Sequence, residues 1–455
     1  MKKLLSVLFL AYLLCTTAFS QPSQNSQPQT PLGKKEIREI VSVLADSVKQ
    51  NYVDEKIANS IHKQLKQNIT KGEYDKVTSP QELSALLSKQ LVALSTDLHF
   101  GVDYKPVTAN SVQRRMPNTY NHLAPYNYHF AKMEILPGNI GLLQIDQFVP
   151  TEYTGHLIVA AMNFFSNTDA LIIDLRKCIG GDPRTVAQLS GYFFKEPVLL
   201  HVSNSRVANV SSEFWSTKTD FKATERGKIA FTTDAAKEIK ADYSKLTEIP
   251  IYVLTSNTTF SAGEGMAFGL QTRGRAKTVG ETTGHGGNGV RPFRLPHNFQ
   301  VFIPFVEVVS PITGKGYQQT GVLPDIPTTP AKAIEVAHAT ALQQLHEQAT
   351  DEATKRRLAW EIRVTQLRKQ PEPQKELKFY AGKYGTREIK FEEGDLYYQR
   401  EGGTKTQLEP LGNRHFLMDK FTILEFSPDF QTLQIHQQSG SSNAYNRTDK
   451  TANLN

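Results

Sequence analysis

Strands and helices alternate in the middle of the chain, and this pattern constrains the fold more than any other feature of the sequence. From Asn139 onward, apolar runs at residues 142–145, 170–175 and 251–254 are separated by segments of helical or turn character. Short apolar runs bounded by turn residues are typical of buried strands, and their alternation with helices is typical of a parallel sheet. The sequence therefore predicts an α/β core at residues 139–345.

Helical segments flank this core on both sides. Apolar residues recur at helical spacing from Ile37 to Val48 and again from Leu83 to Leu94, which predicts two or more amphipathic helices. The chain is again helical from Ala331 to about Arg368 and breaks at Pro371. Its last eighty residues alternate in short segments. We expect a helical N-terminal domain at 36–103 and a connecting segment at 104–138. This segment is too short and too poorly patterned for a PDZ domain. After the core we expect a helical linker at 346–375 and a small β accessory domain at 376–455.

The first twenty residues have the features of a secretory signal peptide. Lys2 and Lys3 give a positive start, residues 4–15 are apolar, and Ala18-Phe19-Ser20 is a small-x-small cleavage site. A lipid-attachment site at Cys15 is disfavoured because the bulky Leu14 precedes it. Residues 21–35, rich in Gln, Pro and Ser, are predicted to be a disordered leader. No later run approaches the length of a membrane span, so the mature chain is expected to be exported to the periplasm or the extracellular space.

Charge and cysteine content exclude several other classes of protein. Without Lys2 and Lys3 the formal net charge falls from +7 to +5, and the basic residues are scattered, which argues against a nucleic-acid-binding surface. Cleavage of the leader leaves Cys178 as the one cysteine, so an intramolecular disulfide and a cysteine-based metal site are excluded. The histidines lack metal-binding spacing. We therefore expect no metal and no other cofactor, and the oligomeric state stays open.

Ser261 stands where a predicted strand at 251–254 gives way to a predicted helix that begins at Ala262. A hydroxyl at such a junction is exposed at the top of a sheet, close to the N–H groups of the first helical turn, and this arrangement suits a nucleophile. The same residue has a structural interpretation, because Ser261-x-x-Glu264 is also a capping box. The segment alone does not decide between the two.

A pair of glycines follows the preceding strand of the core, in the segment Asp174-Leu175-Arg176-Lys177-Cys178-Ile179-Gly180-Gly181. Glycines at the end of a strand allow close approach of the backbone to a ligand, and Pro183 marks the start of a helix. This loop is therefore a candidate donor of N–H groups to an oxyanion. An ordinary glycine turn is the alternative.

Two histidines are candidates for a general base. His99 lies in Asp97-Leu98-His99, just beyond the second amphipathic helix, and His285 lies in a glycine-rich loop. A histidine needs a hydrogen-bonded partner to act as a base.

These segments, together with Thr320-Gly321-Val322-x-Pro324-Asp325 and Gly280-Glu281-Thr282-Thr283-Gly284, occur in the order found in one family. The chain resembles the tail-specific (C-terminal-processing) serine peptidases, in the branch that contains the tricorn core protease and the modules of interphotoreceptor retinoid-binding protein. The resemblance covers residues 36–345 and implies a crotonase-like, Clp-protease-like α/β core that hydrolyses peptide bonds in a peptide or protein substrate.

The resemblance also implies roles for individual residues. Ser261 matches the nucleophile and His99 the base, while the N–H groups of Gly180 and Ala262 match the oxyanion hole. The family's Ser-Lys members place a lysine in the helix after the nucleophile, and no such lysine is present here.

Two positions depart from the family pattern. Cys178-Ile179 replaces the usual Asn-Gly before the glycine pair, and Gln318 stands where the carboxylate that orients the base is expected. The amide oxygen of Gln318 can accept a hydrogen bond from the imidazole but supplies no charge. Weak activity, or substitution by another acid such as Glu281, is the expected consequence.

The sequence thus predicts an exported serine endopeptidase that acts through a Ser261 acyl-enzyme. Two alternatives stay open, since one fold can serve several functions. The first is a weak or inactive peptidase fold that binds an apolar ligand or peptide. The second is a surface protein that binds a glycan or a partner through its β module.

Overall fold

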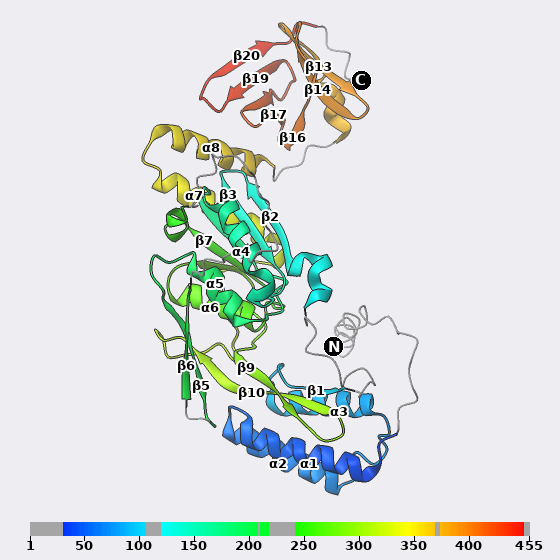
Figure 1. Ribbon diagram of the computed structural model, residues 1–455. Helices are drawn as coiled ribbons and strands as arrows, with labels where there is room; N and C mark the ends of the chain where they lie inside the picture. The colour runs from blue at the N-terminus through cyan, green and yellow to red at the C-terminus, as the bar shows by residue number, and fades with distance from the viewer. Residues whose placement is uncertain (1–30, 106–119, 208–209, 218–241, 369–373, 450–455) are drawn as a thin grey trace, which may run out of the picture. The chain divides into compact units, whose positions relative to one another are not determined.

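The computed structural model describes residues 31–105, 120–207, 210–217, 242–368 and 374–449 (Figure 1). The predicted signal peptide at 1–20 lies outside the described residues, as do residues 21–30 of the predicted leader and residues 106–119 of the predicted connecting segment. The described chain divides into two compact units. The first consists of residues 31–96, 100–105 and 292–303, and the second contains the remainder.

Helices build most of the first unit: α1 (Lys34–Asn51), α2 (Glu55–Thr70) and α3 (Pro80–Ser95). The apolar residues that recur at helical spacing, such as Ile40 and Leu44, are fully buried in its core. Strand β1 (Gly101–Tyr104) pairs antiparallel with the first part of β10 (Phe299–Val309). Residues 295–303, from much later in the chain, complete the core of this unit, and the sequence did not predict their place there.

A six-stranded sheet forms the centre of the second unit, in the order β11-β8-β7-β4-β3-β2. Five of its strands are parallel and β2, at one edge, is antiparallel. The strands are β2 (Phe130–Leu136), β3 (Ile140–Ile145), β4 (Ala170–Asp174), β7 (Ile251–Thr255), β8 (Lys277–Gly280) and β11 (Ile326–Pro327). Loops that follow neighbouring parallel strands lie together at the carboxyl edge of the sheet, where α/β proteins place their sites.

Helices cover both faces of this sheet. The strand residues alternate between two apolar clusters, because successive side chains of a strand point to opposite faces. Leu171 and Ile173 pack with α4 (Thr151–Phe165), α5 (Pro183–Gly191) and α6 (Ala262–Thr272). Ile172 and Tyr252 pack instead with α7 (Ala333–Gln348) and α8 (Glu352–Leu367). The result is a three-layer α/β/α arrangement (Figure 1).

The fold class expected from the sequence is confirmed: a mixed α/β core with a helical N-terminal region and a C-terminal region of strands. Strand β2 comes from the segment that was expected only to connect two domains, and it pairs with β3 over most of its length. The sheet therefore begins before residue 139. Short 3₁₀ helices lie at Asn121–His129, Ser244–Thr247, Pro330–Lys332 and Gln374–Tyr380.

A second sheet contributes strands close to the carboxyl edge of the first. The last part of β10 pairs antiparallel with β5 (Leu199–Ser205), and β5 pairs with β6 (Val210–Trp215). Strand β9 (Asn288–Arg294) also pairs with β10.

The C-terminal region holds two small antiparallel sheets around a core rich in aromatic rings, including Tyr380, Tyr384 and Phe426. One sheet contains β12 (Gly382–Tyr384), β13 (Arg387–Glu392), β14 (Asp395–Arg400) and β15 (Thr406–Gln407). The other contains β16 (Glu409–Gly412), β17 (His415–Asp419), β18 (Thr422–Phe426), β19 (Thr432–Gln437) and β20 (Ser442–Asn446).

Helix α8 packs against this β region. Trp360 and Val364 of α8 share a small apolar cluster with Leu411 and Ile423, and the indole N–H of Trp360 donates to the carbonyl of Lys420 at 3.0 Å. The domain boundary at residue 376 stays a prediction, because part of the helical linker contributes to the same packing.

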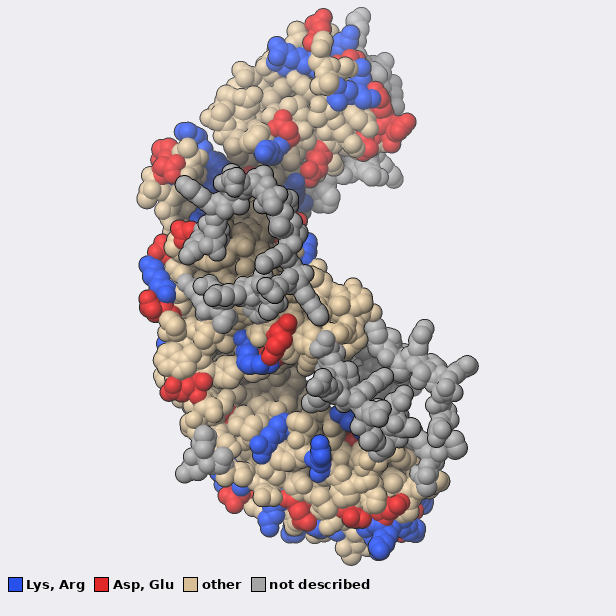
Figure 2. Space-filling model, in the orientation of Figure 1, with Lys and Arg blue, Asp and Glu red and all other residues tan. Residues whose placement is uncertain are grey.

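The surface carries mixed charge. Figure 2 shows Lys and Arg interspersed with Asp and Glu on the face drawn. Among the described helices, none is both long enough and apolar enough to cross a membrane.

Candidate active site

Ser261 occupies a strained turn between β7 and α6. Strand β7 is fully buried, and α6 begins at Ala262, directly after the serine. The backbone of Ser261 has φ 51° and ψ −118°, a region that costs a non-glycine residue about 1–3 kcal/mol. Strained residues of this kind cluster at functional sites, and a serine on a sharp strand-to-helix turn is the geometry of a nucleophile elbow.

The buried carboxylate of Glu264 holds this turn in place. Its Oε2 accepts hydrogen bonds from the N–H groups of Ser261 at 2.9 Å and Gly286 at 2.7 Å. Its Oε1 accepts from the hydroxyl of Thr283 at 2.5 Å and from the N–H of His285 at 2.8 Å. Burial raises the pKa of Glu264 above its usual value, although these four hydrogen bonds act to lower it. One carboxylate thus ties the start of α6 to the loop at residues 283–286.

Half of the predicted capping box is therefore present. The backbone N–H of Ser261 donates to Glu264, but the Ser261 side chain makes no cap hydrogen bond. The functional and structural interpretations of this segment are compatible, since the cap uses the backbone of Ser261 and leaves its hydroxyl for chemistry.

The glycine loop after β4 approaches Ser261 closely. Gly180 has φ 98°, and a Cβ atom added to it would lie 2.7 Å from Ser261 Cβ and 3.2 Å from Ala262 N. Gly181 has φ 132°, and its Cβ would lie 2.0 Å from the carbonyl oxygen of Phe148. Both the positive φ and the lack of space require glycine. The residues expected to form the oxyanion hole, Gly180 and Ala262, are thus neighbours.

Direct hydrogen bonds join the two loops. The Phe260 N–H donates to the carbonyl of Cys178 at 2.9 Å, and the Thr259 hydroxyl donates to the carbonyl of Leu175 at 2.8 Å. Ala262 is the first residue of α6, where N–H groups have no acceptor within the helix and the helix dipole favours negative charge. The arrangement can stabilise an oxyanion next to Ser261.

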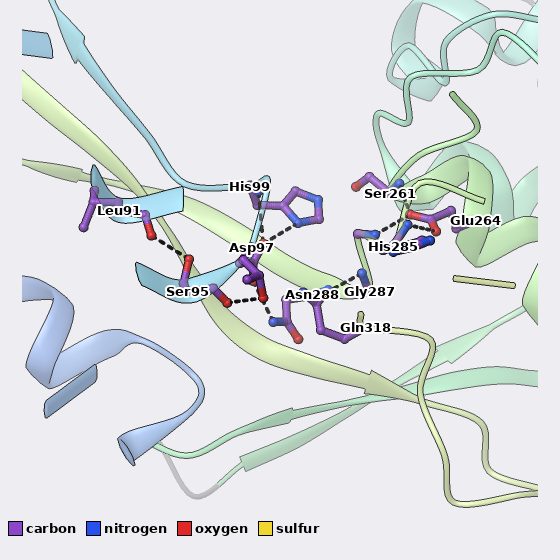
Figure 3. A network of polar contacts seen from close by, with 12 residues as sticks. Leu91, Ser95, Asp97, His99, Ser261, Glu264, His285, Gly287, Asn288 and Gln318 are labelled. Atoms are coloured by element: carbon purple, nitrogen blue, oxygen red, sulfur yellow. Dashed lines mark hydrogen bonds and ion pairs between the residues drawn. The ribbon is translucent and has the colours of Figure 1, made fainter. Parts of the chain in front are cut away.

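His99 lies beside this turn. Its ring packs on Phe260, the residue before Ser261, with 4.6 Å between ring centroids. The imidazole is 6% exposed, and within the described chain its buried Nε2 has no hydrogen-bond partner. Figure 3 shows the His99 ring and the Ser261 hydroxyl pointing toward each other. The structure thus brings these two predicted residues together.

The carboxylate next to His99 belongs to Asp97. Asp97 Oδ1 lies 3.3 Å from His99 Nδ1 and also accepts the backbone N–H of His99 at 3.0 Å. The Asp97 side chain is fully buried, and its Oδ2 accepts a hydrogen bond from the Asn288 amide at 2.8 Å. Sequence reasoning used the Asp97-Leu98-His99 motif to find the histidine but did not assign a role to its aspartate.

Gln318 does not take the place that was expected for it. Its Oε1 accepts hydrogen bonds from the N–H groups of Gly287 at 2.6 Å and Asn288 at 3.0 Å, and none of the described contacts joins its side chain to His99. Gln318 supports the backbone of Asn288, which in turn contacts Asp97 (Figure 3).

The alternative base, His285, and the alternative acid, Glu281, have no described contact with His99 or Ser261 through their side chains. His285 is exposed, has φ 73°, and is held through its backbone N–H by Glu264. The N–H of Glu281 donates to the carbonyl of Thr255, and the Thr255 hydroxyl donates to the carbonyl of Glu281. No described contact links the Glu281 carboxylate to either histidine. Among the described residues, no group of three or more His, Cys, Asp or Glu side chains is arranged to hold a metal ion.

Two family models match this chain. The model of peptidase family S41 matches residues 139–328, and the model described as the N-terminal domain of Peptidase_S41 in eukaryotic IRBP matches residues 33–132. Together they span more than half of the chain. The chain contains a peptidase S41 domain, preceded by an S41 N-terminal domain. The resemblance inferred from the sequence is thus confirmed, and the matched segment coincides with the α/β core. The S41 domain supports a peptidase function, with peptides or proteins as substrates.

Solved structures that resemble this S41 chain include three with low sequence identity. A lipoprotein from Streptococcus agalactiae is 16% identical, with 70% of this chain and 99% of that chain covered and a TM-score of 0.45. The photosystem II D1 C-terminal processing protease is 14% identical, with 64% and 93% covered and a TM-score of 0.41. The tricorn protease is 12% identical, with 69% and 37% covered and a TM-score of 0.43. The S41 assignment itself rests on the family models.

Proposed function

We propose that this protein is an exported serine endopeptidase in which Ser261 is the nucleophile and His99 the general base. The observation that carries the proposal is the pairing of a strained Ser261 with a buried histidine that has a carboxylate on one ring nitrogen and no partner on the other. A nucleophile, a base and an orienting group in this order form the triad arrangement of acyl-transfer enzymes.

The reaction follows from these positions. Ser261 Oγ attacks the carbonyl carbon of the substrate while His99 Nε2 takes the hydroxyl proton. The carbonyl oxygen becomes an oxyanion that accepts hydrogen bonds from the N–H groups of Gly180 and Ala262. Collapse of this intermediate breaks the C–N bond, and His99 returns the proton to the leaving amine. An ester on Ser261 remains, and water activated by His99 then hydrolyses it.

Asp97 is proposed as the orienting carboxylate in place of Gln318. With Nδ1–H directed at Asp97, the imidazole keeps the tautomer whose Nε2 accepts the serine proton. The negative charge of Asp97 also favours the imidazolium that forms during attack. Weak activity was expected because residue 318 is not a carboxylate. With Asp97 in that role, this expectation no longer follows.

Export is proposed from the leader at residues 1–20. The expected mature chain begins at Gln21 and is released to the periplasm or the extracellular space. Amino-terminal sequencing of the protein recovered outside the cytoplasm tests this, and an uncleaved Met1 there would contradict it.

Labelling with a fluorophosphonate, which reacts with activated serines, tests the nucleophile. We expect stoichiometric labelling of the wild-type protein, none of Ser261→Ala, and normal labelling of Ser439→Ala, whose serine is exposed on a distant turn. Hydrolysis of fluorescein-labelled casein is expected to fall by about 10⁴-fold or more in Ser261→Ala. An unlabelled, inactive wild-type protein would favour the alternative that the site only binds an apolar ligand or peptide.

A further inference from the structure

A cavity of about 490 Å³ opens beside Ser261. Its lining residues come mainly from β5, β6, β9 and β10 and from the first turns of α5 and α6, and all of them belong to the second unit. Apolar side chains make up much of the lining: Val186, Phe214, Phe305, Val306, Val308 and Tyr317. A volume of this size is typical of ligand pockets and has room for a large side chain.

Charge is almost absent from this cavity. Among the described lining residues, Arg291 is the one Lys, Arg, Asp or Glu. Its guanidinium lies 4.5 Å from the centre of the Phe305 ring, so part of its charge is directed at an aromatic face. A cationic side chain would meet this guanidinium and find no anion in the lining.

Apart from Arg291, the polar side chains in the walls are neutral. His201 stacks on Phe214 with 4.6 Å between ring centroids and 8° between planes. Burial lowers the pKa of His201 to about 4, so its imidazole is uncharged at neutral pH. Ser203 and Ser205 of β5 and Ser212 of β6 add hydroxyls to the lining. A buried charge without a partner is costly, whereas an apolar side chain gains from leaving water.

We propose that this cavity is the specificity pocket for the residue on the acyl side of the cleaved bond, and that it selects a large, uncharged, apolar side chain such as phenylalanine or leucine. The inference rests on the proposed function of Ser261. The acyl side is indicated because the lining includes Ala262, assigned above to the oxyanion hole, and Gly181, the neighbour of Gly180. His99, which protonates the leaving amine in the proposed mechanism, is not among the lining residues.

The first test is a series of peptidyl coumarin amides that differ only in the acyl-side residue, so that the leaving group is constant. We expect kcat/KM for phenylalanine or leucine to exceed that for alanine by about 10- to 100-fold. Norleucine and lysine have similar length, and we expect lysine to be about 100-fold worse. Equal rates across the series, or a preference for lysine, would overturn the proposal. A second series of fluorescence-quenched peptides varies only the residue on the leaving side of the cleaved bond. Selectivity that appears only in this second series would also overturn the proposal.

Added charge in the wall is the second test. Val306→Asp introduces an anion with little change in volume, and Ser212→Asp does the same from β6 if the first variant does not fold. Either is expected to raise the lysine-to-norleucine ratio by at least about 10-fold. Ile312→Asp is the matched control, since Ile312 is exposed on the turn after β10 and does not line the cavity. A ratio that changes equally in control and test variants would contradict the assignment.

Binding without catalysis separates this inference from the proposed function. Peptides that end in phenylalanine, norleucine or lysine are titrated calorimetrically into Ser261→Ala. We expect the same order of affinities as in the hydrolysis series. If the wild-type protein is inactive but this order holds, the pocket stands and the peptidase proposal fails. If the three peptides bind equally, the pocket assignment fails, whether or not the wild-type protein hydrolyses amides.

Discussion

The nucleophile side and the base side of the candidate site are held in different ways. Ser261 and Gly180 lie on loops that directly follow two neighbouring strands, β7 and β4, and backbone hydrogen bonds join these loops. His99 depends instead on side chains, because Asp97 contacts its ring and Asn288, 191 residues further along the chain, contacts Asp97. One half of the site is built from backbone, the other from side-chain contacts distant in sequence.

Because of this difference, the two halves of the site should be sensitive to different kinds of substitution. A backbone frame tolerates many side-chain changes but not an added Cβ at its closest contacts. A chain of side-chain hydrogen bonds is disturbed when the spacing between its backbone segments changes. It also depends on the charge of each side chain and on which atoms donate or accept hydrogen bonds. Substitutions on the two sides should therefore fail for different physical reasons.

The largest effect is expected from removal of charge on the base side. Asp97→Asn keeps an oxygen for the His99 N–H but removes the anion beside the imidazole, and we expect kcat to fall by about 10³- to 10⁴-fold. Asp103→Asn is the control, because Asp103 is exposed on β1. Unchanged kcat in Asp97→Asn would mean that another group orients His99.

The nucleophile side is tested by added volume. Gly180→Ala places a methyl group against Ser261 Cβ, and displacement of an oxyanion donor should lower kcat by about 10²-fold. Gly274 also has positive φ, at 64°, but nothing lies within 4 Å of its Cβ position. Gly274→Ala should therefore cost about 1 kcal/mol of unfolding free energy and leave kcat intact. Equal losses of activity in both variants would attribute the effect to strain rather than to the site.

A smaller effect is expected from the carboxylate that frames the nucleophile. Glu264→Gln presents an NH₂ group where N–H and O–H donors converge, so at least one buried donor loses its acceptor. We expect a loss of about 1–3 kcal/mol in unfolding free energy, measured by denaturant titration. Glu347→Gln on α7 is an exposed control. Wild-type stability in Glu264→Gln would show that the frame does not need the carboxylate.

The pH dependence of stability gives this variant a second readout. Burial raises the pKa of Glu264, so the folded protein binds this proton more tightly than the unfolded chain does. Stability should then fall as the pH rises from the unfolded pKa to the folded pKa. Glu264→Gln lacks this part of the pH slope, and identical slopes in the two proteins would contradict the shift.

The smallest effect is expected from Gln318→Glu. A glutamate oxygen can still accept the two backbone N–H groups of Gly287 and Asn288, and His99 already has Asp97 as its carboxylate. We expect kcat within about twofold of the wild-type value. A large gain in rate would instead show that residue 318 reaches the base, and the base side would then resemble the family pattern.

Much of the nucleophile side could be predicted from the sequence. The strand at 251–254, the turn at Ser261 and the glycine pair at 180–181 are contiguous patterns, and the parallel sheet places their ends together. The strain at Ser261 and the closeness of Gly180 follow from the packing of two loops. From the sequence, only the need for glycine and for a sharp turn could be predicted, not the strain or the distance themselves.

The base side could be predicted only in part. His99 follows from a local motif, but the position of Gln318 depends on the path of residues 283–288, which three hydrogen bonds to Glu264 help to fix. No local periodicity encodes that path. The same holds for residues 295–303, whose burial with the N-terminal helices depends on an antiparallel pairing with β1.

Cys178 has a practical consequence for chemical probes of this protein. Its thiol is enclosed, a Cβ at Gly263 would lie 3.1 Å from its sulfur, and burial raises its pKa to about 12. The reactive thiolate is therefore almost absent at neutral pH. Maleimides and iodoacetamide should leave the described chain unmodified while it is folded, so thiol chemistry reports unfolding and serine chemistry reports the site. Thiol labelling and serine labelling can therefore be measured in the same sample, without a reducing agent.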